Sequence, residues 1–183
     1  QVFMAMELLD GVDLTARGEQ SPLSVPETVR IVEQIADALA FAHDRGVIHR
    51  DIKPPNIMLV EGGRIKIMDF GIARMRQSDV KTQTGMMLGT PRYMSPEQVV
   101  GRPSDHRSDI FSLGTVLYEL LTNTKLYSGA EATEIMYNVA NQRPLPPSRI
   151  NRAVSPMLDL VVAKAQEKSA EDRYQDAHQL AAD

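Results

Sequence analysis

The chain has 183 residues, of which 43% are hydrophobic and 24% charged, and its formal net charge is −4. These values are typical of a soluble globular domain or a large part of one, and the negative charge argues against a dedicated nucleic-acid binder, which needs a clustered basic surface. The absence of Cys excludes disulfides and thiolate metal sites, and no apolar run approaches the roughly 18 residues that span a bilayer. We therefore expect this segment to contact neither nucleic acid nor a membrane.

The first elements expected along the chain are a strand and a long helix. Residues 2–9 form an apolar run that indicates a strand, and Asp10-Gly11 indicates the turn that ends it. Ser24-Val25-Pro26-Glu27 is a capping-box pattern, after which apolar residues follow at helical spacing as far as Gly46. This pattern predicts a helix that begins after Ser24 and ends near Gly46.

The second half of the chain predicts a hairpin, a long irregular segment and a group of helices. Residues 57–68 form two short apolar runs around a Gly-containing turn, which predicts the hairpin. Residues 71–108 show no sustained period, and a segment that long is usually functional or disordered. Residues 110–121 are apolar on most faces, which is typical of a buried helix. Further helices are expected to start at Ser128 and Ser155, with a last one over residues 174–183, so the body is mainly helical.

The loop between the first helix and the hairpin carries a dense set of polar residues. Asp51 and Asn56 lie in this loop, and Asp69 follows the hairpin. Two carboxylates and an amide oxygen beside Lys53 are hard-oxygen ligands plus one cation, the set that holds Mg²⁺ and phosphate together. Each piece alone is a weak signal, because Asp-Phe-Gly by itself is more often a turn. The alternative is a structural loop with a solvated Lys53.

Four stretches carry a resemblance to a known family. HRDIKPPN at residues 49–56, DFG at 69–71 and MSPE at 94–97 resemble motifs of the eukaryotic-type Ser/Thr protein kinases, and residues 109–114 resemble the start of the family's central helix. MELLDG and GTPRYMSPEQ are most similar to the bacterial branch. The resemblance implies an α+β protein-kinase-like fold, in which residues 1–183 are the hinge with a short strand, the catalytic hairpin and the mainly α-helical C-terminal lobe, while the small lobe is absent.

The resemblance also implies an activity, its cofactors and its site. The activity is transfer of the ATP γ-phosphate to Ser or Thr of protein substrates in bacterial signal transduction, with ATP and Mg²⁺. Asp51 is implied as the catalytic base and Lys53 as the group on the γ-phosphate, while Asn56 and Asp69 hold Mg²⁺. The interval from Asp51 to Lys53 resembles Ser/Thr-directed rather than Tyr-directed members.

Further residues match ATP-binding positions of the family. Glu7 and the Leu9 backbone match the hinge that binds adenine, Met58 the floor under the ring, and Asp13 the position that reaches ribose. Met6 matches the position behind the hinge. Core packing accounts for the two Met residues nearly as well, because an adenine pocket and a core need the same apolar surface.

Four residues match structural positions of the family. Glu97 and Arg173 resemble its buried ion pair, and Asp109 resembles the carboxylate that anchors the catalytic loop from below. Arg50, directly before the catalytic Asp, is the natural partner of a phosphorylated residue. His49 is expected to pack this loop, since no second His lies near in sequence to complete a metal site.

The irregular segment is implied to carry regulation and substrate binding. We expect Thr82 and Thr84 to be phosphorylated by a second copy of the same kinase in a homodimer, and Gly89 and Thr90 to form the ledge that receives a peptide substrate. The plainer alternative is that Thr82 and Thr84 are polar residues on a solvated loop.

Two rival readings belong to other classes. A pseudokinase or scaffold is disfavoured because Asp51, Lys53, Asn56 and Asp69 are intact, and a small-molecule kinase usually lacks the long activation segment. We expect a cytoplasmic location, although bacterial relatives often continue into a membrane span and an external sensor. Residues 1–183 alone are expected to be inactive, because half of the phosphate clamp belongs to the small lobe.

Overall fold

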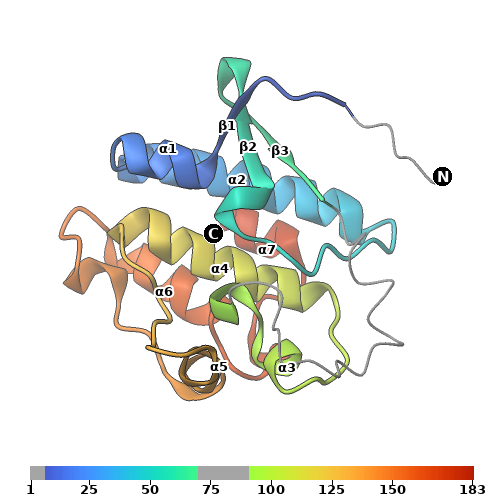
Figure 1. The fold of residues 1–183 in the computed structure, drawn as a ribbon, viewed down its shortest axis with the longest axis vertical. Coiled ribbons are helices and arrows are strands. Elements are labelled where there is room, and N and C mark those ends of the chain that lie inside the picture. Colours follow the sequence, from blue (N-terminus) through green and yellow to red (C-terminus); the bar gives the residue numbers. More distant parts are fainter. Residues whose placement is uncertain (1–6, 70–90) are drawn as a thin grey trace.

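The computed structural model describes residues 7–69 and 91–183. The strands are β1 (Gly11–Asp13), β2 (Ile57–Val60) and β3 (Arg64–Ile67). The α-helices are α1 (Leu14–Gln20), α2 (Val25–His43), α3 (Pro96–Val99), α4 (His106–Thr122), α5 (Ala132–Asn141), α6 (Pro156–Ala165) and α7 (Ala177–Ala182). The short 3₁₀ helices are η1 (Pro54–Asn56), η2 (Glu61–Gly63), η3 (Pro91–Tyr93), η4 (Pro147–Arg149) and η5 (Ala170–Asp172). The strands lie at one end of the molecule, and the rest is the mainly helical body that the sequence predicted (Figure 1).

The sheet consists of three antiparallel strands in the order β1-β2-β3. Leu59 of β2 pairs with Val12 on one side and with Ile65 on the other, so the expected hairpin is confirmed. The strand expected over residues 2–9 is wrong where it can be compared, because residues 7–10 are not in a strand and Gly11 belongs to β1. A Cβ on Gly11 would lie 2.4 Å from the Leu59 carbonyl oxygen. Gly11 thus permits close strand pairing and does not form the predicted turn.

The core lies around α4, which packs against α2 on one side and against α6 on the other (Figure 1). Ser24 caps α2 by accepting a hydrogen bond from the Glu27 backbone amide, and Gly46 with φ 74° follows the end of this helix. α4 is buried on most of its circumference, as predicted, and Phe111 and Leu113 are fully buried. This rigid core supports the loop that joins α2 to β2.

Two helices start at other residues than the sequence predicted, and a third helix was not predicted. α5 begins at Ala132 and not at Ser128, because the Ser128 carbonyl instead accepts a hydrogen bond from the Asn138 side chain. α7 begins at Ala177, where Asp176 caps it, and not at Tyr174, whose side chain is buried in the core. α1 was not predicted. Ser155 caps α6 as expected.

None of the helices within residues 7–69 and 91–183 combines the length and hydrophobicity that crossing a membrane requires.

Candidate active site

The loop between α2 and β2 brings three predicted site residues together. The Lys53 Nζ lies 2.8 Å from Asp51 Oδ2, and the Asn56 Nδ2 donates to the same oxygen at 3.0 Å. Asn56 Nδ2 also donates to the Asp51 backbone carbonyl at 2.9 Å. The Asp51 side chain is 55% exposed, so it is accessible to a substrate. Because both neighbours bind Oδ2, the second carboxylate oxygen of Asp51 is the one available for a further contact.

A buried carboxylate on α4 supports this loop from below. Asp109 is fully buried and accepts hydrogen bonds from the backbone amides of His49 at 2.8 Å and Arg50 at 2.7 Å. Arg50 has φ 67°, a left-handed conformation that costs a non-glycine residue about 1–2 kcal/mol. The two charge-assisted bonds to Asp109 offset this cost. They hold the backbone immediately before Asp51 in one conformation.

His49 connects the loop to the end of the hairpin. Its fully buried ring places Nε2 2.8 Å from the Met68 carbonyl, and Nδ1 accepts a hydrogen bond from the Asp51 backbone amide at 3.2 Å. This pattern corresponds to the tautomer that carries its proton on Nε2. The ring therefore ties Asp51 to the residue that precedes Asp69, a packing role like the one expected from the sequence.

Asn56 and Asp69 lie on adjacent segments. The Met68 backbone amide donates to the Asn56 carbonyl at 2.8 Å, which brings the residue before Asp69 against Asn56. Asp69 is exposed and has φ 59°. The Asn56 amide nitrogen is engaged by Asp51, so the amide oxygen is the atom suited to a cation. An amide oxygen and a carboxylate fit Mg²⁺, which prefers hard oxygen ligands.

Three of the four predicted nucleotide-binding residues, Glu7, Asp13 and Met58, lie in the sheet or contact it, whereas Leu9 precedes β1 outside any strand. Asp13 of β1 is the cross-strand partner of Met58 in β2. The Asp13 carboxylate also caps α1, accepting hydrogen bonds from the backbone amides of Thr15 and Ala16. Glu7 forms an ion pair with Lys66 of β3 at 2.8 Å. Asp13 therefore has a structural role that the sequence analysis did not identify.

Glu97 and Arg173 form a bidentate ion pair. The two distances are 2.9 and 2.8 Å, and the side chains are 0% exposed for Arg173 and 15% exposed for Glu97. Arg173 also donates to the backbone carbonyls of Glu167 and Lys168, and Ser108 Oγ donates to Glu97 at 2.5 Å. Burial raises the pKa of Glu97, but hydrogen bonds from Arg173 and Ser108 outweigh it and hold the pKa at about 2. The pair joins α3 to the segment before α7.

Two functional candidates were missed by the sequence analysis. His43, at the end of α2, places Nε2 2.8 Å from Asp109, and Gln98 donates to the Arg50 carbonyl at 3.1 Å. Both therefore contact groups that fix the backbone before Asp51. For His43 a signal existed, since it follows the buried Leu39 by four residues and thus lies on the buried face of the helix.

Some predicted positions lie outside the described residues. These are Met6, Thr82, Thr84, Gly89 and Thr90.

Comparisons with known proteins identify the family. Residues 1–181 match the model of the protein kinase domain. The chain is 41% identical to the serine/threonine-protein kinase PknB of Mycolicibacterium smegmatis over 184 residues, and 42% identical to PknB of Mycobacterium leprae over 183 residues. Each alignment covers 99% of this chain and 29% of the relative, so the chain spans less than a third of these proteins. The chain therefore belongs to the protein kinase family, in the bacterial branch of its Ser/Thr kinases.

Proposed function

We propose that this chain is the hinge and larger lobe of a kinase that transfers the ATP γ-phosphate to Ser or Thr hydroxyls of proteins in bacterial signalling. The observation that carries the proposal is the arrangement of Asp51, Lys53 and Asn56 on a loop held by the buried Asp109. The relatives named above, which are serine/threonine-protein kinases, support the same activity. The mainly helical fold with one small sheet supports the assignment to the larger lobe.

The polar groups of the loop have the chemistry that the proposed phosphate transfer requires. The substrate hydroxyl donates its proton toward the free oxygen of Asp51 while its oxygen forms a bond to the γ-phosphorus, and the bond from that phosphorus to the bridging oxygen of ADP breaks. Lys53 places positive charge where negative charge accumulates on the transferred group. Asn56 and Asp69 would hold Mg²⁺, which neutralises phosphate charge when bound.

The nucleotide base is proposed to lie near β1 and β2. Met58 on β2 supplies apolar surface under the adenine, Asp13 on β1 reaches the ribose, and Glu7 and the Leu9 backbone bind the adenine edge. The cross-strand pairing of Asp13 with Met58 supports this placement.

The test of the proposed function is the acceptor specificity of the complete kinase. Three peptides that differ only in one residue, Thr, Ser or Tyr, are incubated with the enzyme, ATP and Mg²⁺, and phosphate incorporation is followed by mass spectrometry. We expect phosphate on the Thr and Ser peptides and none on the Tyr peptide. Nucleotide binding without transfer to any peptide would instead support a pseudokinase.

Regulation is proposed to depend on Thr82 and Thr84. A phosphothreonine carries about −1.5 to −2 charge at pH 7 and orders a segment by pairing with Arg. Arg50 is suited to this role because its amide and carbonyl are held by Asp109 and Gln98, which fixes the start of its side chain beside Asp51.

Replacing Thr82 and Thr84 together by Ala is expected to lower kcat/KM by about tenfold, the effect of losing one charge-assisted contact. Mass spectrometry of the active enzyme should find phosphate on one of the two residues, placed there by a second copy. Thr90→Ser serves as the control, since it keeps a hydroxyl at the neighbouring ledge. Full activity of the double variant, or phosphate only on other residues, contradicts the assignment.

A further inference from the structure

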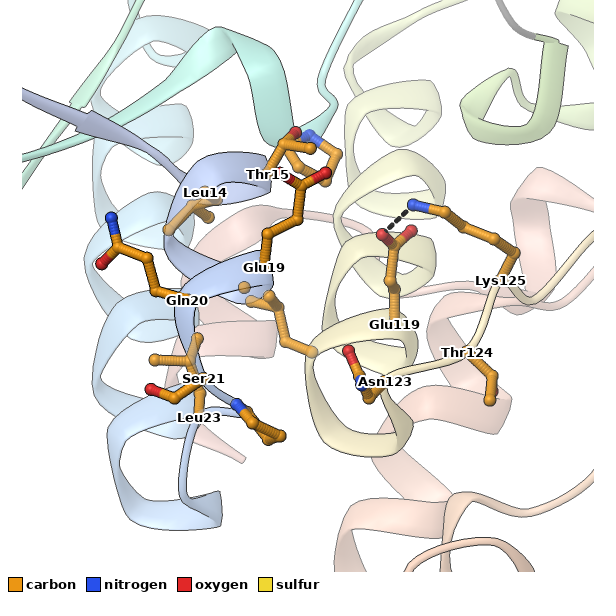
Figure 2. Close-up of a pocket in the computed structure, with 14 residues that line it drawn as sticks. Leu14, Thr15, Glu19, Gln20, Ser21, Leu23, Glu119, Asn123, Thr124 and Lys125 are labelled. Atoms are coloured by element: carbon orange, nitrogen blue, oxygen red, sulfur yellow. Dashed lines mark hydrogen bonds and ion pairs between the residues drawn. The ribbon is translucent and has the colours of Figure 1, made fainter.

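A cavity of about 430 Å³ lies between α1 and the C-terminal end of α4 (Figure 2). Leu14, Thr15 and Glu19 line it from the α1 side, and Glu119 and Lys125 line it from the α4 side. Its wall mixes apolar and polar groups. A polypeptide segment fits such a surface, because it presents both kinds of group.

The catalytic loop lines this cavity, and the segment after the proposed ledge contacts one of its lining residues. Pro54, the residue after Lys53, is part of its lining. Tyr93 follows the proposed substrate ledge by three residues, and its hydroxyl donates to Glu119 at 2.6 Å. Pro54, three residues after Asp51, thus lines the same cavity as Glu119, and Glu119 also contacts the segment that follows the proposed ledge. The cavity therefore adjoins the catalytic loop, where the acceptor hydroxyl is proposed to lie.

Both oxygens of Glu119 are already engaged from within the chain. Oε2 accepts the Tyr93 hydroxyl, and Oε1 pairs with the Lys125 ammonium, the contact drawn as a dashed line in Figure 2. Burial and the neighbouring Glu119 raise the pKa of Tyr93, which keeps the hydroxyl protonated as a donor. The Glu119 side chain is only 16% exposed, whereas that of Lys125 is 45% exposed. The Glu119 carboxylate is therefore held in the cavity wall, and the more exposed Lys125 ammonium covers it.

We infer that Lys125 is a specificity-determining residue, which fills the cation site formed by Glu119 and Tyr93 and so selects substrates with an uncharged side chain at this point. The inference rests on the proposed function and names the substrate feature that the same site accepts. An incoming Arg or Lys must displace Lys125 or lie beside it, and like charges in contact oppose binding. An uncharged side chain meets no such cost.

The opposite wall strengthens the expected effect of removing Lys125. Glu19 is exposed and contributes a second carboxylate to the cavity lining. With Lys125 in place the three charged residues sum to −1, and without it they sum to −2. Lys125→Met therefore converts a filled cation site into an acidic one.

The experiment compares peptide specificity of the complete kinase before and after the change. The peptides share one acceptor Thr in an Ala-rich sequence, and a single Arg is placed in turn at each flanking position. At one flanking position, replacing Ala by Arg should raise the kcat/KM of the peptide. This increase should be about tenfold larger for the Lys125→Met enzyme than for the wild type. Adding Glu119→Gln should abolish this gain, because Gln still accepts the Tyr93 hydroxyl but carries no charge.

Controls separate this inference from a surface ion pair that only stabilises the fold. Lys164→Met removes an equal charge from α6, which lies outside the cavity lining, and should leave the specificity profile of the wild type. A purely structural role of Lys125 predicts a lower melting temperature with an unchanged profile. That result, or a wild type that already gains tenfold from Arg at the same position, overturns the inference.

Failure of the proposed function has a different signature. In that case the wild type phosphorylates none of the peptides. The inference is then tested by fluorescence anisotropy, which measures the affinity of the same labelled peptides for Asp51→Asn and for Asp51→Asn combined with Lys125→Met. Tighter binding of the Arg peptide to the second variant supports the inference, and equal binding contradicts it.

Discussion

Replacing Asp51 by Asn is expected to lower kcat of the complete kinase by about 10²–10⁴-fold, the usual contribution of a positioned general base. Asn preserves the size of the side chain and an oxygen that accepts the hydrogen bonds from Lys53 and Asn56. It lacks the carboxylate that is proposed to accept the substrate proton. Steady-state phosphate transfer to a Thr peptide measures the change, and nucleotide affinity, measured separately, should change little because Asp51 is proposed to contact the acceptor and not the nucleotide.

Asp37→Asn is the matched control for this variant. Asp37 is exposed on α2, and the same substitution there should leave kcat unaltered. A wild-type kcat for Asp51→Asn would exclude Asp51 as the base, whereas loss of the folded state, detected by circular dichroism, would place its main role in the loop structure.

Replacing Arg173 by Ala is expected to reduce the free energy of unfolding by about 3–5 kcal/mol, the cost of leaving one partner of a buried ion pair alone. The Arg173 side chain is fully buried and bidentate with Glu97, and its removal also frees the carbonyls of Glu167 and Lys168. Total stability of a domain is roughly 5–15 kcal/mol, so the loss is a large fraction. Urea unfolding measures it.

Arg152→Ala provides the comparison, because Arg152 is exposed and substitutions at such positions usually change stability by less than about 0.5 kcal/mol. Equal unfolding midpoints for Arg173→Ala and the wild type would show that the pair with Glu97 does not stabilise the fold.

The same pair predicts a pH dependence. The folded-state pKa of Glu97, about 2, lies below its ordinary value of 4.5, so its contribution to stability is present above pH 4.5 and is lost as the pH falls toward 2. Arg173→Ala removes the main hydrogen-bonding cause of this depressed pKa. We therefore expect the wild type to lose more stability than the variant over this acid range.

Much of the helical body could be predicted from local patterns. α2 combines a capping Ser24 with apolar residues at helical spacing, and α4 is apolar around most of its surface, so both were identified. α1 was missed because it is short and contains Gly18, and because its start depends on the Asp13 cap. β1 was misplaced because three residues with one Gly form a strand only by pairing with β2.

Within the candidate site, the motif residues were identified, and the resemblance also implied Asp109 and His49 as supports of the loop, whereas His43 and Gln98 were missed. Asp51, Lys53 and Asn56 lie within one short loop, so their order in the sequence indicates their proximity. His43 and Asp109 are 66 residues apart, and Glu119 meets Tyr93 across 26 residues. Such contacts follow from the packing of α2 and η3 against α4, and no local pattern specifies them.

The most direct test of the account is the position of a divalent cation bound with nucleotide. Crystals of the complete kinase with a non-hydrolysable ATP analogue and Mn²⁺, an oxygen-preferring ion like Mg²⁺, locate the metal by its anomalous scattering. We predict a peak at coordination distance from the Asn56 side-chain oxygen and the Asp69 carboxylate, with the γ-phosphate beside Lys53. A nucleotide bound with its metal away from both Asn56 and Asp69 would contradict the account.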